Sequence, residues 1–188
     1  MSAHNDLVEK LTTLNLIGET LNRAVDVHQV LNHALAELTR LMGLNTGWIF
    51  LVDPAARERR FGSGYRLAAH HNLPPGLDPE TSNAWDGNCI CQNVTSDPLR
   101  VAATNEIHCT RLQQINGDAT GLTVHATVPL RAGDRTLGIL NVAAPDWSSF
   151  SPEALSLLTA VGGQLGTALE RARLYDLLRE RRGDEQEA

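Results

Sequence analysis

The chain has 188 residues, of which 42% are hydrophobic and 20% are charged, and this composition fits one globular domain rather than a disordered or fibrous chain. The formal net charge is −6, and Lys10 is the single lysine. Phosphate recognition favours a basic surface, so nucleic acid is excluded as the main partner, and a lysine-based phosphate loop is excluded with it. No apolar run approaches the roughly 20 residues of a membrane helix, and the N-terminus lacks signal-peptide features, so we expect a soluble, cytoplasmic protein without a membrane partner.

Two amphipathic segments open the chain. Leucine and isoleucine recur at helical spacing from residue 6 to residue 24, which predicts an N-terminal helix. A second helix is expected to begin after Asp26, with Gln29 as the partner of Asp26 in a capping box. It is expected to end at Gly43, because glycine readily takes the positive φ that closes a helix.

Strand-forming residues dominate the next ordered segments. Residues 46–52 are apolar and rich in strand formers, and residues 65–70 are their expected hairpin partner. Residues 122–130 and 136–144 are apolar arms of similar length around a short turn at Gly133, which predicts a second hairpin. The fold class is therefore α+β, with a central antiparallel sheet flanked by N-terminal helices and a long C-terminal helix.

The C-terminal helix has a clear start signal. Ser151 is expected at the N-cap and Pro152 at the first helical position, and the helix can run to about Arg182 with three glycines as its only weak points. Residues 179–188 are charged and are expected to form a tail. A narrow seam typical of a coiled coil comprises Leu155, Leu158, Gly162, Leu165, Leu169 and Ala172.

This pattern resembles a GAF domain over most of the chain. Residues 121–142 resemble its closing strands, residues 150–158 the start of its last helix, and residues 35–51 its first helix and first strand. The resemblance implies three parts: a dimerisation and signalling helix over residues 1–24, the GAF domain over residues 25–178, and a tail or linker to an output module over residues 179–188.

A narrower resemblance points to the N-terminal GAF domain of bacterial sensor histidine kinases with a Cys-x-Cys element. It rests on Cys89 and Cys91, on residues 105–112, on His125 and on residues 170–175. In such proteins the last helix continues as a dimeric signalling helix towards the kinase core, which implies a homodimer through the N- and C-terminal helices. These 188 residues contain no phosphoacceptor region and no ATP-binding glycine boxes, so we expect a non-catalytic sensory module for a small ligand or for redox state.

The cysteines suggest the nature of the signal. Cys89 and Cys91 flank one residue, so in an extended loop both thiols can face one side, and Cys109 can return from another loop. Three thiolates and one further ligand make the usual set for zinc or an iron–sulfur cluster, with His125 as the fourth ligand and His108 as the alternative. A thiol redox switch and simple buried packing are the competing interpretations.

A small-molecule pocket is the usual function of a GAF cavity. Trp85 precedes the cysteines and is its best aromatic candidate, whereas Trp48 lies in a predicted core strand. The predicted pocket is lined by Trp85, Asn88, Cys109, His125 and Asn141.

Two further functions stay open through the resemblance. Some small GAF proteins reduce free methionine sulfoxide with an attacking and a resolving thiol, and Cys91 with Cys109 could serve in that chemistry. Phytochrome-like GAF domains attach a bilin to a cysteine placed about where Cys109 lies, usually with histidine directly after it. Here His108 precedes Cys109 and Thr110 follows it, so a bilin photosensor is the weaker alternative.

Overall fold

The computed structural model describes residues 27–53, 64–82, 84–85, 89–95, 105–115 and 118–187. The helix predicted over residues 1–24 and the cap predicted at Asp26 lie outside these residues. The helices and strands are, in order, α2 (Val27–Leu41), β1 (Thr46–Val52), β2 (Tyr65–His71), α4 (Ile90–Thr95), β3 (Asn105–His108), α5 (Thr110–Gln114), β4 (Val124–Ala132), β5 (Arg135–Ala144) and α6 (Pro152–Glu187), with short 3-10 turns at Pro75–Leu77 and Trp147–Ser149.

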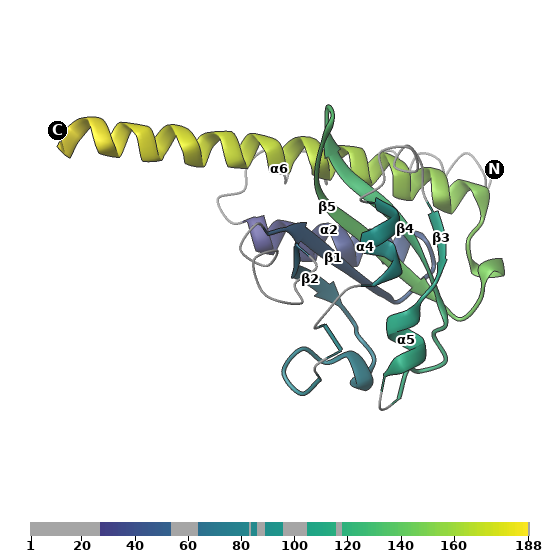
Figure 1. Cartoon of the computed structure of the whole chain (residues 1–188). Coiled ribbons are helices and arrows are strands. Elements are labelled where there is room, and N and C mark those ends of the chain that lie inside the picture. The colour runs from purple at the N-terminus through teal and green to yellow at the C-terminus, as the bar shows by residue number, and fades with distance from the viewer. Residues whose placement is uncertain are drawn as a thin grey trace.

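The described strands form one antiparallel sheet in the order β2-β1-β5-β4-β3 (Figure 1). Both predicted hairpins are confirmed, since β1 pairs with β2 and β4 pairs with β5. Gly133 takes a φ of 57° in the tight turn between β4 and β5, and Gly43 takes a φ of 67° after α2, as expected. The predicted α+β class is therefore confirmed.

Side chains of each strand alternate between the two faces of the sheet. One face packs against α2 and α6, and it holds the larger hydrophobic core. The strand residues in this core include Ile49, Leu51, Val124, Ala126, Val128, Leu130, Leu140 and Val142. The intervening residues point to the opposite face, which is covered by the segments between β2 and β4.

Helix α6 begins as predicted, because the backbone N–H of Ala154 donates to Ser151 Oγ at 3.1 Å. The expected coiled-coil seam, however, packs within the chain. Leu158 and Leu165 are fully buried in the sheet–helix core, and Leu155 and Leu169 pack against it. These leucines therefore pack in or against the core of the domain rather than forming a coiled-coil surface, and the homodimer itself stays a prediction.

The charged C-terminal segment is helical rather than a separate tail. The backbone of α6 continues to Glu187, beyond the expected helix end near Arg182, and the domain boundary at residue 178 stays a prediction. The segment is rich in arginine and glutamate, which have high helix propensity, and it contains no proline. Figure 1 shows the yellow C-terminal part of α6 extending well beyond the sheet. No helix in the described ranges is both long enough and apolar enough to span a membrane.

Two glycines of α6 lie where the helix approaches β4 most closely. A Cβ atom added at Gly162 would lie 2.8 Å from a methyl carbon of Val128, and one at Gly166 would lie 2.2 Å from the carbonyl oxygen of Arg131. Real Cβ atoms do not approach so closely, so the helix would have to move away from the sheet. Two of the three glycines predicted as weak points of the helix therefore serve its packing.

We expect Gly166→Ala to lower the free energy of unfolding by about 2 kcal/mol, because an overpacked contact against backbone costs more than the gain in helix propensity returns. Gly163→Ala is the matched control. A Cβ atom at Gly163 meets nothing within 4 Å, so this variant should gain up to about 1 kcal/mol. Urea unfolding followed by circular dichroism measures both. Equal effects of the two substitutions would contradict the close-packing role.

Candidate functional site

The second face of the sheet carries a compact buried group, which we call the cysteine–aromatic cluster. All three cysteines of the chain belong to it, although they come from different segments. The cluster comprises Trp48, Phe50, Leu77, Cys89, Cys91, Ile107, Cys109, Leu112, Ile139 and Ala143, with Tyr65, Leu73, Trp85 and Leu122 among the residues packed against it.

Cys89 and Cys91 are joined by a disulfide, with their Cα atoms 5.5 Å apart. The expected extended loop is wrong, because Cys91 lies in the first turn of α4 and Cys89 directly precedes that helix. Gln92 explains the local fold: its side-chain Oε1 accepts from the backbone N–H of Cys89 at 3.0 Å, and its own N–H donates to the Cys89 carbonyl. This is the glutamine half of a capping box, and it fixes the start of α4.

Cys109 is a buried free thiol that starts the short helix α5. Its Sγ accepts a hydrogen bond from the backbone N–H of Leu112 at 3.3 Å. Burial raises the pKa of the Cys109 thiol, although backbone hydrogen bonds from Leu112 and Arg111 and the charge of Arg111 act in the opposite direction. A thiol with a raised pKa is a poor nucleophile, so Cys109 is suited to a structural role in this state.

His125 is the second residue of β4 and is fully buried. Its ring packs edge-on against Trp48, with the ring centres 5.3 Å apart. Among the described residues, neither ring nitrogen of His125 has a hydrogen-bond partner, and the same holds for Nε1 of Trp48. Burial, and to a lesser extent the charge of Arg111, lowers the pKa of His125 to about 3. The imidazole is therefore neutral at physiological pH, with polar atoms that nothing described in the protein satisfies.

Arg111 is a site residue to which sequence analysis assigned no role. Only 6% of this residue is exposed, and its guanidinium carbon lies 5.1 Å from the ring centre of Trp85 and 5.6 Å from that of Phe50. Trp85 is itself held in place, because its Nε1 donates to the Leu77 carbonyl at 2.7 Å. A lone arginine on a five-residue helix gave no periodic signal, so only the tertiary fold reveals this buried cation.

Asn141 lies on β5 opposite Trp48, and its amide completes the polar side of the cluster. Its Oδ1 accepts a hydrogen bond from the hydroxyl of Thr127, and its Nδ2 donates to the Trp48 carbonyl at 3.5 Å. Asn141 and its hydrogen-bond partner Thr127 are both fully buried.

The structure brings most of the predicted pocket residues to one face. Trp85 and Cys109 lie in or against the cysteine–aromatic cluster, His125 contacts it, and Asn141 borders it. Asn88 lies outside the described residues. His108 is placed differently, because it is exposed and its ring packs against Trp147 on the other side of β3.

The predicted metal ligands are not assembled in this state. Within the ranges that the structure describes, no group of three or more histidine, cysteine, aspartate or glutamate side chains is placed to hold a metal ion. The disulfide also occupies the sulfur atoms of Cys89 and Cys91, and thiolates are the form that binds metals. The donor set of the disulfide form therefore does not fit zinc or an iron–sulfur cluster, and such a centre stays a prediction for the reduced protein.

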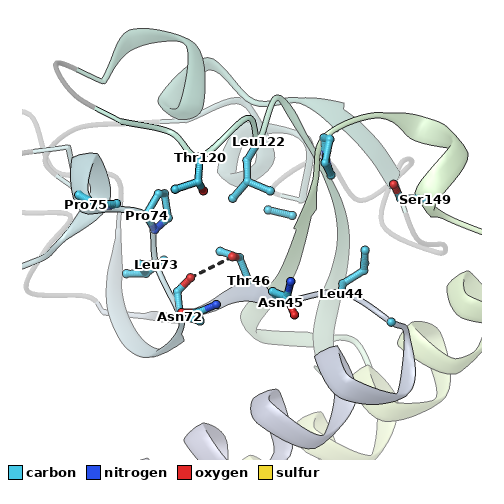
Figure 2. Close-up of a pocket in the computed structure, with 13 residues that line it drawn as sticks. Leu44, Asn45, Thr46, Asn72, Leu73, Pro74, Pro75, Thr120, Leu122 and Ser149 are labelled. Atoms are coloured by element: carbon cyan, nitrogen blue, oxygen red, sulfur yellow. Dashed lines mark hydrogen bonds between the residues drawn. The ribbon is translucent and has the colours of Figure 1, made fainter.

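A pocket of about 560 Å³ opens at the end of the sheet next to the cluster. Figure 2 shows that its walls come from the loop before β1, the segment after β2, the loop before β4 and the segment from the end of β5 to Ser149. Among the described residues no charged side chain lines it, and the polar side chains that do are Asn45, Thr46, Asn72, Thr120 and Ser149. Thr46 is already engaged, since its hydroxyl donates to the Asn72 carbonyl at 2.9 Å.

An antiparallel sheet in the order β2-β1-β5-β4-β3, with helices on one face and the cysteine–aromatic cluster on the other, defines the fold of this α+β domain. A sequence model of the GAF domain matches residues 24–170, and the chain belongs to the GAF domain family.

The chain is 40% identical over 174 residues to the sensor histidine kinase YhcY of Bacillus subtilis (strain 168). This match covers 90% of the chain but 44% of that kinase, so the chain spans less than half the length of its relative.

Solved structures confirm the fold. The GAF domain of an Acinetobacter phosphoenolpyruvate-protein phosphotransferase has a TM-score of 0.63 at 20% identity, with coverage of 88% of this chain and 95% of that chain. The free methionine-R-sulfoxide reductase of Neisseria meningitidis has a TM-score of 0.61 at 17% identity, with coverage of 86% and 89%. Identities this low establish the shared fold and do not transfer an activity.

Proposed function

We propose that this GAF domain is the sensory module of a histidine-kinase-type signalling protein, and that the redox state of Cys89 and Cys91 is its signal. The similarity to a sensor histidine kinase supports the first part. The observation that carries the second part is the disulfide at the start of α4, inside the cysteine–aromatic cluster.

The redox step needs an external dithiol. A thiolate of the dithiol attacks one sulfur of the Cys89–Cys91 bond, which releases the other cysteine and forms a mixed disulfide. The second thiol of the dithiol then attacks the mixed disulfide and releases the remaining cysteine as a thiol. Two electrons and two protons end on Cys89 and Cys91, and the dithiol becomes a disulfide. Cys109 takes no part, because burial raises the pKa of its thiol.

The packing provides a route from this bond to the output helix. Helix α4 contacts β4, and α6 packs along β4 and β5. Reduction releases the covalent constraint on the first turn of α4, so the contact of α4 with β4 can change. A packed interface with two arrangements can convert such a local change into a helix displacement.

A homodimer is the proposed context of this output. The projecting part of α6 exposes four large apolar side chains at helical spacing, Leu174, Tyr175, Leu177 and Leu178. A second copy of the same helix would bury them in a parallel or antiparallel pair. The proposed signal is therefore a change in the packing of two α6 helices.

Reduction with a dithiol is expected to raise the hydrogen-exchange rate of amides in α4 and in the facing part of β4 by about tenfold or more, because the constraint is lost. Mass spectrometry after alkylation counts the thiols, and hydrogen-exchange mass spectrometry locates the change. Cys89→Ser should abolish the redox dependence, whereas the matched Cys109→Ser variant should retain it. Unchanged exchange on reduction would refute redox sensing.

Two assays separate the alternatives. Iron or zinc in protein purified without oxygen would assign the reduced thiols to a metal centre, which the sequence predicts with Cys89, Cys91, Cys109 and His125 as ligands. Thioredoxin-coupled turnover of free methionine sulfoxide would establish the reductase alternative. The reductase alternative is less favoured than the metal centre, because its chemistry needs a reactive thiolate and burial keeps the Cys109 thiol protonated.

A further inference from the structure

We propose that the pocket of Figure 2 is a second input site, which binds a small uncharged molecule with an amide group and an aliphatic part. The inference rests on the sensory role proposed above and adds a ligand class to it. None of the three cysteines lines this pocket, so ligand binding can be tested separately from the redox state of Cys89 and Cys91.

Three loops that are far apart in the sequence turn sharply at this pocket. Gly43 before β1, Asn72 after β2 and Thr120 before β4 all line it, and their φ angles are 67°, 47° and 51°. Asn72 and Thr120 are the non-glycine residues with positive φ in the described part of the chain. A β-branched residue such as threonine rarely takes this conformation, because its side chain crowds the backbone. Strain of this kind concentrates at binding sites, so its coincidence with a pocket points to a ligand.

Hydrogen bonds fix the walls of the pocket before any ligand binds. The hydroxyl of Thr46 donates to the Asn72 carbonyl at 2.9 Å, which ties the start of β1 to the segment after β2. The backbone N–H of Thr123 donates to the Ala144 carbonyl at 3.2 Å, which ties the loop before β4 to the end of β5. A site whose walls are already ordered pays less entropy on binding.

The polar side chains of the pocket carry amides and hydroxyls. Those of Asn45, Asn72, Thr120 and Ser149 form no hydrogen bond with another described residue. Figure 2 shows Asn45 and Asn72 on one side of the space, with Thr120 and Leu122 across from them. An asparagine amide offers one acceptor oxygen and two N–H donors, which is the complement of an amide group on a ligand.

The apolar part of the wall is aliphatic. It includes Leu44, Leu73, Pro74 and Leu122, and no aromatic side chain is among the described residues that line the pocket. A flat aromatic ligand would find no stacking partner here, so an aliphatic group fits this wall better. The volume of about 560 Å³ lies within the range of small-molecule sites.

The charges around the pocket favour an uncharged ligand. No ionisable side chain is among the described residues that line it. Two carboxylates belong to the adjacent turns: Asp118 accepts from the backbone N–H of Thr120 at 2.6 Å, and Asp146 accepts from that of Ser148 at 2.9 Å. Their negative charges disfavour an anion. Either ion would also be desolvated without a counter-charge in the wall, which costs far more than the transfer of an amide that keeps its hydrogen bonds.

The pocket extends to the segment that leads into the output helix. Pro145 and Ser149 line it, and both lie between the end of β5 and the start of α6 at Pro152. The next residue, Phe150, is buried in the core that α6 shares with the sheet. A ligand that contacts Ser149 therefore acts directly before α6 begins, which gives this site its own route to the output.

A series of probes that differ in charge tests the ligand class. N-acetyl-leucinamide is an uncharged amide with an aliphatic side chain, N-acetyl-leucine is its anionic counterpart, and leucinamide is its cationic counterpart. Each is titrated into the full chain by calorimetry at pH 6.5, where the amine of leucinamide is protonated. We expect a Kd below about 5 mM for the uncharged probe and binding at least about threefold weaker for both charged probes. A higher Kd for the uncharged probe, or a smaller difference for either charged probe, would overturn the proposal.

Substitution of Asn72 locates the site. Asn72→Asp keeps the size of the side chain and tolerates the positive φ, but it replaces two N–H donors by a negative charge. The uncharged probe should bind about fivefold more weakly, and leucinamide should bind about fivefold more tightly. The matched control Asn93→Asp changes an exposed asparagine of α4 and should leave the binding of all three probes unchanged. Cys89→Ser should also retain binding, so that loss of redox sensing and loss of ligand binding are told apart. Unchanged binding of the probes in Asn72→Asp would place the ligand elsewhere and refute the site.

Discussion

Replacing Leu165 by aspartate is expected to abolish folding of the domain. Leu165 is fully buried between α6 and the sheet, and loss of a buried leucine side chain alone costs about 2–5 kcal/mol. The new carboxylate would also be desolvated without a described partner, which adds a further penalty. The sum of about 5 kcal/mol or more is comparable to the total stability of a small domain.

The control for this substitution is Leu174→Asp in the projecting part of the same helix. Leu174 is 47% exposed, so we expect a change in the free energy of unfolding within about 1 kcal/mol. Circular dichroism and urea unfolding measure both variants. A cooperatively folded Leu165→Asp variant would show that α6 does not pack against the sheet in solution.

This pair of leucines also decides how dimerisation is tested. A charge at Leu165 destroys the domain and says nothing about association, whereas charges at Leu174 and Leu178 leave the core intact. If the projecting helices pair, the unsubstituted protein should sediment as a dimer at micromolar concentration. The double variant Leu174→Asp, Leu178→Asp should sediment as a monomer. An unchanged sedimentation coefficient would exclude that surface as the interface.

Acidification from pH 7 to pH 4 is expected to lower the free energy of unfolding by about 3 kcal/mol through His125 alone. In the unfolded chain this histidine takes up a proton near pH 6.5, whereas burial lowers its pKa in the folded domain to about 3. The unfolded state therefore binds more protons throughout this window. The native state loses stability as the pH falls below 6.5, and the loss levels off near pH 3.

His125→Leu isolates this contribution, because all other titrating groups are shared with the unsubstituted protein. The variant should lack the extra loss of stability on acidification. At pH 7 it should be more stable by about 1 kcal/mol, since an unsatisfied buried polar group has been removed. Urea unfolding at intervals between pH 4 and pH 7 measures both effects. Parallel stability curves would mean that the imidazole is accessible to protons in the folded state.

Local sequence patterns predicted the helices and strands that are long enough to show several repeats of their hydrophobic pattern. The hairpin of β4 and β5 has two apolar arms of nine and ten residues, and α6 begins with Ser151 and Pro152 as expected. By contrast, α4, β3 and α5 have four to six residues each. Segments this short contain too few apolar positions to show a period, so they were not predicted.

The candidate site was predicted only in part, because its side chains meet through tertiary packing. The prediction of Trp85, Cys109 and His125 as neighbours is consistent with the cluster. The buried cation Arg111 comes from α5, which the sequence did not predict. The seam of α6 was assigned a coiled-coil pattern although it packs against the sheet. Leucines at alternating spacings of three and four can pack against a sheet or against another helix, and sequence alone does not distinguish these two kinds of packing.

Because the backbone of α6 is continuous, a tilt of its anchored half also moves its far end. Its 36 residues correspond to a rod of about 54 Å at a rise of 1.5 Å per residue. The half up to Leu169 is anchored on the sheet, and the remaining half of the helix is about 27 Å long. A tilt of about 5° at the anchored half would move the far end sideways by about 2 Å, as follows from that length. A small tilt between β4 and α6 therefore becomes a displacement of about 2 Å at the far end of the helix.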